Sequence, residues 1–147
     1  MRLADLHRTA FVTGASAGLG RAFAVMLLHE GVQVWGTARD SARLTELTSK
    51  GAGLFHPVAL DLTNAAGSEA AFERAAAEAN GGFDLVIQNA GFGGTFGDFA
   101  DTDFAAWENQ LEAMLLATAR LSRAALRSMR ARNRGCLVHV SSLAAEF

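Results

Sequence analysis

The feature that most constrains this chain is a glycine-rich turn at residues 13–20, TGASAGLG, between a strand-like segment and a helix-like one. Residues 9–13 are a short apolar run. From Gly18 onward, apolar residues recur at helical spacing until Gly31, which is the predicted C-terminal cap. Glycines let a backbone approach a bound group closely, and the free N–H groups of a helix start favour anions. The sequence therefore predicts a strand–turn–helix unit suited to a pyrophosphate.

Strand and helix signals alternate along the rest of the sequence. Further strands are predicted at 32–36, 54–60, 83–88 and 136–141, and further helices at 41–50, 65–79 and 104–131. Ser41 is the predicted N-cap of its helix, and Pro57 places its strand at a sheet edge because proline donates no ladder hydrogen bond. The alternation predicts an α/β fold, a doubly wound parallel sheet, within the single domain 1–147.

One face of the long helix at 104–131 is marked by larger or apolar side chains. These residues are Phe104, Trp107, Leu111, Met114, Leu115, Thr118, Leu121, Ala125 and Met129. Elsewhere, Cys136 is expected to be a small core residue, and Trp35 and Trp107 are expected to be packing groups. The four histidines share no metal-ligand spacing, so no metal site is expected.

The charge pattern argues against several functions. Thirteen basic and fifteen acidic residues leave a net charge of −2 without a concentrated basic face, so neither a nucleic-acid partner nor a membrane surface is expected. No apolar stretch approaches the roughly 20 residues of a membrane span. The first ten residues lack a signal-peptide pattern, and the single cysteine cannot form an internal disulfide. A cytoplasmic protein is therefore predicted.

Four motifs together resemble the short-chain dehydrogenase/reductase family over the whole sequence. They are the turn at 13–20, the DLT segment at 61–63, the QNAG segment at 88–91 and the VHVSS segment at 138–142. The resemblance implies a Rossmann fold with strand order 3-2-1-4-5, truncated after the fifth strand. At residue 88, glutamine stands where the family has asparagine.

The resemblance also implies a bound nicotinamide dinucleotide. The residues that it assigns to cofactor binding are Gly14, Ser16, Gly18, Leu19, Gly20, Arg39, Asp61, Leu62, Asn89 and Gly91. Ala38 stands where an acidic residue would select NAD, and the guanidinium of Arg39 suits a 2′-phosphate. NADP is therefore favoured over NAD. The alternative interpretation is that Arg39 is an ordinary solvated surface charge.

By resemblance, Ser142 is the catalytic serine that hydrogen-bonds the substrate oxygen, beside a tyrosine that exchanges the proton and a lysine that lowers the pKa of that tyrosine. Two features depart from the family. Met114 stands where the family has an asparagine, and the chain has no tyrosine, ending at Phe147 before the Tyr-x-x-x-Lys segment would begin. We expect a fragment that is inactive alone.

The predicted function of the intact protein is NADP-dependent interconversion of a hydroxyl and a carbonyl group on a small molecule, whose identity the sequence does not indicate. The other hypothesis is a non-enzymatic dinucleotide-binding or regulatory protein, for which Met114 and the missing tyrosine are the arguments. A homo-oligomer formed through the long helix 104–131 is also predicted.

Overall fold

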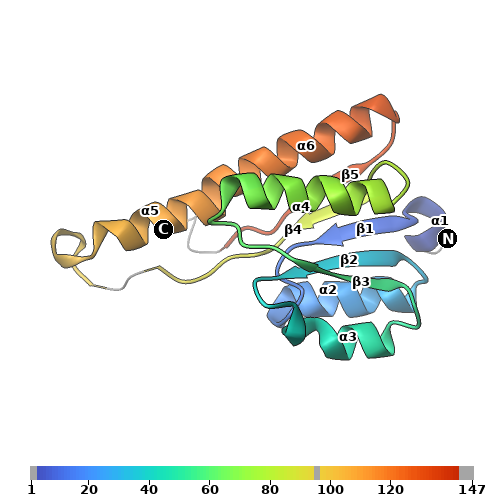
Figure 1. Ribbon diagram of the computed structural model, residues 1–147, viewed down its shortest axis with the longest axis horizontal. Helices are drawn as coiled ribbons and strands as arrows, with labels where there is room; N and C mark the ends of the chain where they lie inside the picture. Colours follow the sequence, from blue (N-terminus) through green and yellow to red (C-terminus); the bar gives the residue numbers. More distant parts are fainter. Residues whose placement is uncertain (1–2, 95–96, 143–147) are drawn as a thin grey trace.

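The structure is a computed structural model that describes residues 3–94 and 97–142. Its five strands form one parallel sheet in the order β3-β2-β1-β4-β5, as expected (Figure 1). The strands are β1 (Thr9–Val12), β2 (Gln33–Ala38), β3 (Phe55–Ala59), β4 (Leu85–Gln88) and β5 (Cys136–His139). Pro57 lies in β3 at the edge of the sheet, which confirms the position expected from its missing N–H.

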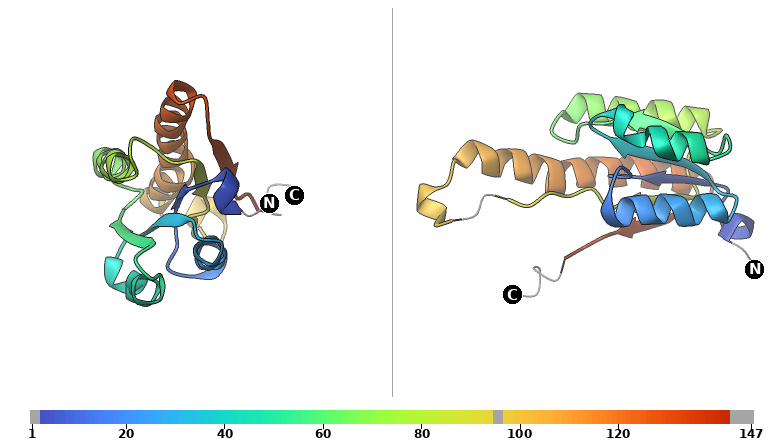
Figure 2. Two further views of the ribbon diagram at one scale, coloured as in Figure 1. Left: turned by 90° about the vertical axis from the view of Figure 1, so that its right-hand side faces the viewer. Right: turned by 90° about the horizontal axis from the view of Figure 1, so that it is seen from below.

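Helices cover both faces of the sheet (Figure 2). They are α1 (Leu3–Leu6), α2 (Gly18–His29), α3 (Thr45–Lys50), α4 (Ala65–Glu78), α5 (Phe104–Leu111) and α6 (Ala117–Ala131). A π-helical turn, Glu112–Leu116, joins α5 to α6 in one long helix, and 3₁₀ turns occupy Ser41–Leu44 and Phe99–Asp101. None of the helices in the described ranges is long and apolar enough to cross a membrane.

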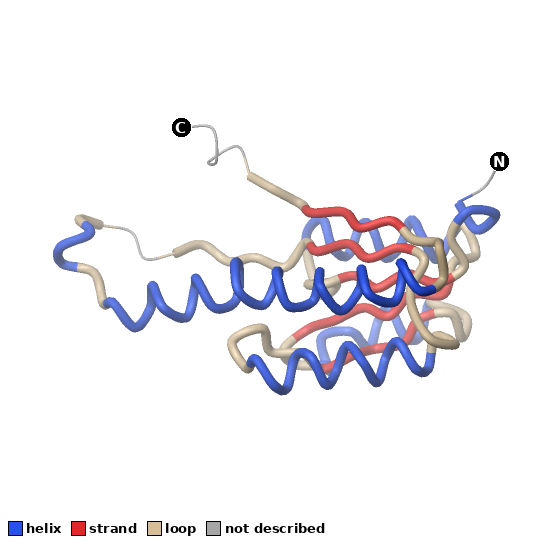
Figure 3. The backbone as a smooth tube through the Cα atoms, turned by 90° about the horizontal axis from the view of Figure 1, so that it is seen from above, coloured by secondary structure: helices blue, strands red, loops and turns tan. Residues whose placement is uncertain are grey.

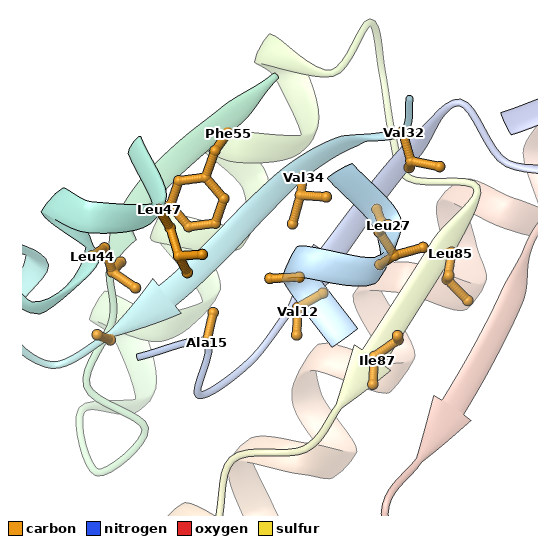
Figure 4. Close-up of a cluster of buried hydrophobic side chains, with 13 residues drawn as sticks. Val12, Ala15, Leu27, Val32, Val34, Leu44, Leu47, Phe55, Leu85 and Ile87 are labelled. Atoms are coloured by element: carbon orange, nitrogen blue, oxygen red, sulfur yellow. The ribbon is translucent and has the colours of Figure 1, made fainter. Parts of the chain in front are cut away.

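Alternate residues of β1, β2 and β4 enter two separate cores, because successive side chains point to opposite faces. Val12, Val34 and Ile87 belong to the core on the side of α2, where Leu27 joins them (Figure 4). Phe11, with its neighbours Trp35 and Val86 in the adjacent strands, belongs to the core under α4 and α6. The central strands β1, β2 and β4 are therefore buried on both faces.

The helix expected at 41–50 differs at its start. Ser41 is not its N-cap: the 3₁₀ turn Ser41–Leu44 comes first, and Asp40 caps it by accepting a 2.9 Å hydrogen bond from the Ala42 N–H. A carboxylate one residue earlier in the sequence therefore performs the capping role.

The long helix does not bury the single face that its spacing marked. Leu111, Met114 and Leu115 are exposed, whereas Ala113 and Ala117 are buried. The π-helical turn changes the rotation of the helix between α5 and α6. In addition, α5 extends beyond the ends of the strands, where the sheet offers no surface to cover (Figure 3). From Leu121 onward the expected face does pack against the sheet.

Cys136 is exposed, so the prediction of a core residue was wrong. Its strand, β5, has a hydrogen-bonded neighbour on one side only among the described residues. Most of β5 is correspondingly exposed.

Candidate functional site

The glycine-rich turn leads from β1 to the amino end of α2 at the carboxyl edge of the sheet. The N-cap, Ala17, has no side-chain acceptor for the first N–H groups of α2. Gly18 adopts φ of 54°, and a Cβ built there would have no atom within 4 Å, so space in front of the helix is open. Unpaired N–H groups, the positive helix pole and open space together fit a pyrophosphate.

Gly20 is required by close packing rather than by its backbone angle. A Cβ at this position would lie 2.3 Å from the Gly14 carbonyl oxygen and 2.5 Å from Nδ2 of Asn89. The first turn of α2 therefore lies directly against both the glycine loop and the segment after β4. This explains why the predicted cofactor residues of the two segments occupy one place.

Thr13 holds the glycine turn to the segment that follows β4. Its Oγ1 accepts hydrogen bonds from the backbone N–H groups of Asn89 and Ala90, both at 2.9 Å. On the other side, the N–H of Gly14 donates to Oγ1 of Thr37 in β2 at 3.2 Å. Thr13 belongs to the turn predicted from the sequence but was not assigned a role in it, and Thr37 was not predicted to lie in the site. The available signal was a hydroxyl side chain at or just after the carboxyl end of each of two neighbouring strands.

Arg39 and Asp61 follow the ends of the neighbouring strands β2 and β3, which are paired up to Ala38 and Ala59. Asp61 accepts hydrogen bonds from the N–H of Thr63 at 3.0 Å and from its hydroxyl at 2.8 Å. These bonds, and to a lesser degree the positive charge of Arg39, hold the pKa of Asp61 below its usual value. Both charged residues are exposed at the carboxyl edge of the sheet, the edge at which the glycine turn also lies.

The remaining cofactor residues expected from the sequence differ in how accessible they are. Leu19 is exposed and Ser16 half-buried, both at the glycine turn. Leu62 is half-buried and packs against the core under α4 and α6. Its side chain is therefore engaged in the fold, and its main chain is the part left for a ligand.

Gln88 links the end of β4 to the long helix. Its amide nitrogen donates a 2.9 Å hydrogen bond to Oγ of Ser122 in α6, and Gln88 itself is buried. Three residues later, a Cβ at Gly91 would lie 3.5 Å from the methyl group of Met114. Met114 is the central residue of the π-helical turn, a type of distortion often found at functional sites.

Ser142 follows β5 at the same edge of the sheet. The strand is held there by the hydrogen bond from the Val140 N–H to the Gln88 carbonyl oxygen, at 2.9 Å. Ser142 is exposed and is the last residue before the undescribed segment 143–147. The structure thus brings the glycine turn, the 88–91 segment and Ser142 to one edge. Among the described residues, no group of three or more His, Cys, Asp or Glu could hold a metal ion.

Comparison with known proteins agrees with this arrangement. The family model described as short chain dehydrogenase matches residues 8–147. An uncharacterized oxidoreductase from Myxococcus xanthus is 40% identical over 144 residues, which cover 94% of this chain and 55% of that protein. The chain thus spans about half the length of this relative.

Solved structures show the same fold. A short-chain dehydrogenase from Streptomyces avermitilis has a TM-score of 0.88 at 31% identity, over 95% of this chain and 51% of that one. L-sorbose reductase from Gluconobacter frateurii, complexed with NADPH and L-sorbose, has a TM-score of 0.85 at 30% identity, over 95% and 54% of the two chains. With its turn, its sheet order and its matched residues, the chain belongs to the short-chain dehydrogenase family.

Proposed function

We propose that this chain is the cofactor-binding part of an NADP-dependent oxidoreductase that interconverts a hydroxyl and a carbonyl group on a small molecule. The observation that carries the choice of NADP is the end of β2, where the small, buried Ala38 is followed by the exposed Arg39. No carboxylate at Ala38 opposes a 2′-phosphate, and a guanidinium is available to bind one. The NADPH bound to L-sorbose reductase supports the proposal.

In the proposed binding mode, the first N–H groups of α2, at Gly18 and the residues after it, hold the pyrophosphate. Asp61 and the main chain of Leu62 contact the adenine, and Arg39 binds the 2′-phosphate. Gly91 would be a contact for the nicotinamide end of the cofactor. When bound, NADPH would supply a hydride to the carbonyl carbon, and in the reverse direction NADP⁺ would accept a hydride from the alcohol carbon.

The residues of this chain would orient the substrate rather than complete the reaction. Ser142 donates a hydrogen bond to the substrate oxygen, which develops negative charge as hydride arrives. A serine hydroxyl is too weak an acid to deliver the proton. The 147 residues include no tyrosine, so they do not contain the residue that donates the proton in the family that this chain resembles. We therefore propose that turnover requires the part of the relatives that this chain does not match.

The function is tested first by binding and then by turnover. Calorimetry should show tighter binding of NADPH than of NADH to the 147-residue chain, and equal affinities would contradict the NADP assignment. The chain alone should not oxidise NADPH with a panel of aldehydes and ketones. A longer protein that includes the expected Tyr-x-x-x-Lys segment should do so, and its Ser142→Ala variant should lose most activity while keeping NADPH affinity.

A non-enzymatic dinucleotide-binding protein is the second candidate. Met114 favours it, because a thioether occupies the centre of the π-helical turn where the family has an asparagine. A longer protein that binds NADPH tightly but reduces none of the carbonyl compounds would support this candidate. Recovery of turnover in its Met114→Asn variant would show that the site is an impaired enzyme instead.

We also propose that the long helix 104–131 pairs with a second copy of the chain. Its outer surface carries the exposed apolar side chains of Leu111, Leu115 and Leu126. Glu108 lies in the half before the π-helical turn, and Arg127 lies in the half after it. An antiparallel pair would place these opposite charges near one another across the interface.

A further inference from the structure

Asp84 is a buried carboxylate at the amino edge of the sheet, opposite the proposed cofactor site. Its side chain is 6% exposed. It accepts hydrogen bonds from the N–H of Arg8 at 2.8 Å, from Nη1 of Arg132 at 3.1 Å and from Nη2 of Arg134 at 2.7 Å. A charge in this position is stable only when it is fully paired, and three donors meet that requirement.

Both arginines belong to the turn between α6 and β5. Residues 132–135 form this turn, and β5 begins at Cys136. The N–H of Cys136 donates a 2.8 Å hydrogen bond to the main-chain oxygen of Asp84. Asp84 therefore binds the turn through its carboxylate, and it binds the first residue of β5 through its main-chain carbonyl oxygen. This arrangement, Asp84 with Arg132, Arg134 and Arg8, is called the Asp84 clamp below.

The clamp matters because, in the described structure, β5 is paired with β4 on one side and has no strand on the other. Cys136, Val138 and His139 are exposed. Leu137 packs, partly buried, against the core under α4 and α6, and Val140, just after β5, packs partly buried against the core on the side of α2. Burial therefore contributes little to fixing where β5 lies along β4.

A strand transmits a displacement at one end to the other. Ser142 lies six residues beyond Cys136, or about 20 Å along an extended chain. A slip of one residue would turn every side chain of β5 to the opposite face of the sheet, and a slip of two would move Ser142 by about 7 Å. The position of Ser142 at the carboxyl edge thus depends on the register of β5 on β4, to which the attachment at the amino edge contributes.

We propose that Asp84 is the positioning residue for Ser142, because the Asp84 clamp fixes the register of β5 on β4. The inference rests on the proposed function only in taking Ser142 as the catalytic serine. The glycine turn lies after β1 at the carboxyl edge of the sheet and the clamp lies at the opposite, amino edge, so we expect NADPH binding to change little when the clamp is removed.

Amide hydrogen exchange of the 147-residue chain tests the clamp directly. Asp84→Asn keeps the size of the side chain and removes its charge. Exchange in residues 136–142 should accelerate about tenfold or more, while β2 and β3 change less than about twofold. An unchanged β5, or equal acceleration in all strands, would overturn the proposal.

A milder variant covers the case in which Asp84→Asn does not fold. Arg134→Gln removes one donor whose side chain is 45% exposed, and it should accelerate exchange in β5 selectively but less. Arg130→Gln, an exposed arginine of the same helix, is the matched control and should change nothing. Cys136 is exposed and is the only cysteine, so a fluorinated tag there should give a second or broadened ¹⁹F signal in the clamp variants alone.

Kinetics in the longer protein separate this inference from the proposed function. There, Asp84→Asn should lower kcat about tenfold or more while the KM for NADPH stays within about twofold. Asp84→Glu, which keeps the charge, should recover part of kcat. An unchanged kcat in Asp84→Asn would overturn the positioning role. If the longer protein has no activity at all, the proposed function fails, but exchange and ¹⁹F spectra still decide whether the clamp sets β5.

Discussion

Asn89 donates two hydrogen bonds to Thr13: its backbone N–H binds Oγ1 at 2.9 Å, and its side-chain amide binds the carbonyl oxygen at 3.1 Å. The two residues are 76 positions apart and follow the ends of the neighbouring strands β1 and β4. Because the two segments bind each other at the carboxyl edge, the glycine turn and the 88–91 segment form one surface. Thr13 is therefore a structural requirement of the site.

Thr13→Val should destabilise the protein by about 2–4 kcal/mol, because the backbone N–H groups of Asn89 and Ala90 would lose their buried acceptor. Urea unfolding measures this loss. Thr13→Ser keeps the hydroxyl and should cost about 1 kcal/mol or less. If both variants unfold at the same urea concentration, the hydroxyl is not what joins the segments.

The double change of Ala38 to Asp and Arg39 to Gln should reverse the cofactor preference. It removes a charge-assisted contact of about 1.5–3 kcal/mol with the 2′-phosphate and adds an acceptor for the ribose hydroxyl of NAD. Calorimetry with NADPH and NADH measures the ratio of affinities. Arg74→Gln, at an exposed position of α4, is the control and should leave the ratio unchanged. Retention of NADPH preference in the double variant would show that Arg39 is an ordinary surface charge.

Gly18→Ala and Gly31→Ala form a matched pair at the two ends of α2. Both residues have positive φ, 54° and 82°, and both would place a Cβ in open space. Each change should therefore lower the free energy of unfolding by a similar amount, about 1–2 kcal/mol, through backbone strain. Only Gly18→Ala should weaken NADPH binding, by about tenfold, which equals the loss of one phosphate hydrogen bond. Equal affinities in the two variants would mean that the pyrophosphate does not bind at Gly18.

Asp61 should make stability depend on pH in the acid range. The hydrogen bonds from Thr63, then the charge of Arg39, lower the pKa of its carboxyl in the folded state. Its contribution is therefore present above the ordinary aspartate pKa of about 4 and is lost as the pH falls through the lower folded value. Asp61→Ala should cost about 0.5–1 kcal/mol at neutral pH and less in acid, as measured by unfolding at a series of pH values. A cost that does not change with pH would contradict this account.

Leu115→Arg should dissociate the proposed dimer. Leu115 is 60% exposed on the long helix, and a charge there would remain unpaired in an apolar interface. Sedimentation equilibrium should show a smaller average mass than for the original chain. Met26→Arg, a 46% exposed position on α2, should have no effect on mass. A monomeric original chain at high concentration would refute pairing through this helix.

Local sequence signals were sufficient for most of the framework. The apolar runs, the glycine turn and Pro57 determined the strand–helix order, the edge position of β3 and the place of α2. They succeeded because periodicity, glycine conformation and the missing N–H of proline act within a few residues. Family resemblance then supplied the sheet order and the identity of the four motif segments.

Other features depended on contacts between distant segments. The hydrogen bond from Gln88 to Ser122 and the two bonds from Arg132 and Arg134 to Asp84 join residues 34 to 50 positions apart. Cys136 was expected in the core from its residue type, but its exposure was decided by which strands lie beside β5.

The long helix shows most clearly the difference between features that local sequence determines and features that contacts between distant segments determine. The sequence by itself determined that residues 104–131 are helical, because helix formation follows local propensity and spacing. It did not determine which residues that helix buries. Ala113 and Ala117 are buried in place of Leu111 and Leu115 because the π-helical turn rotates α5 relative to α6 and because only α6 lies over the sheet. A residue is buried only where another surface covers it, so the tertiary structure decided which residues of this helix are buried.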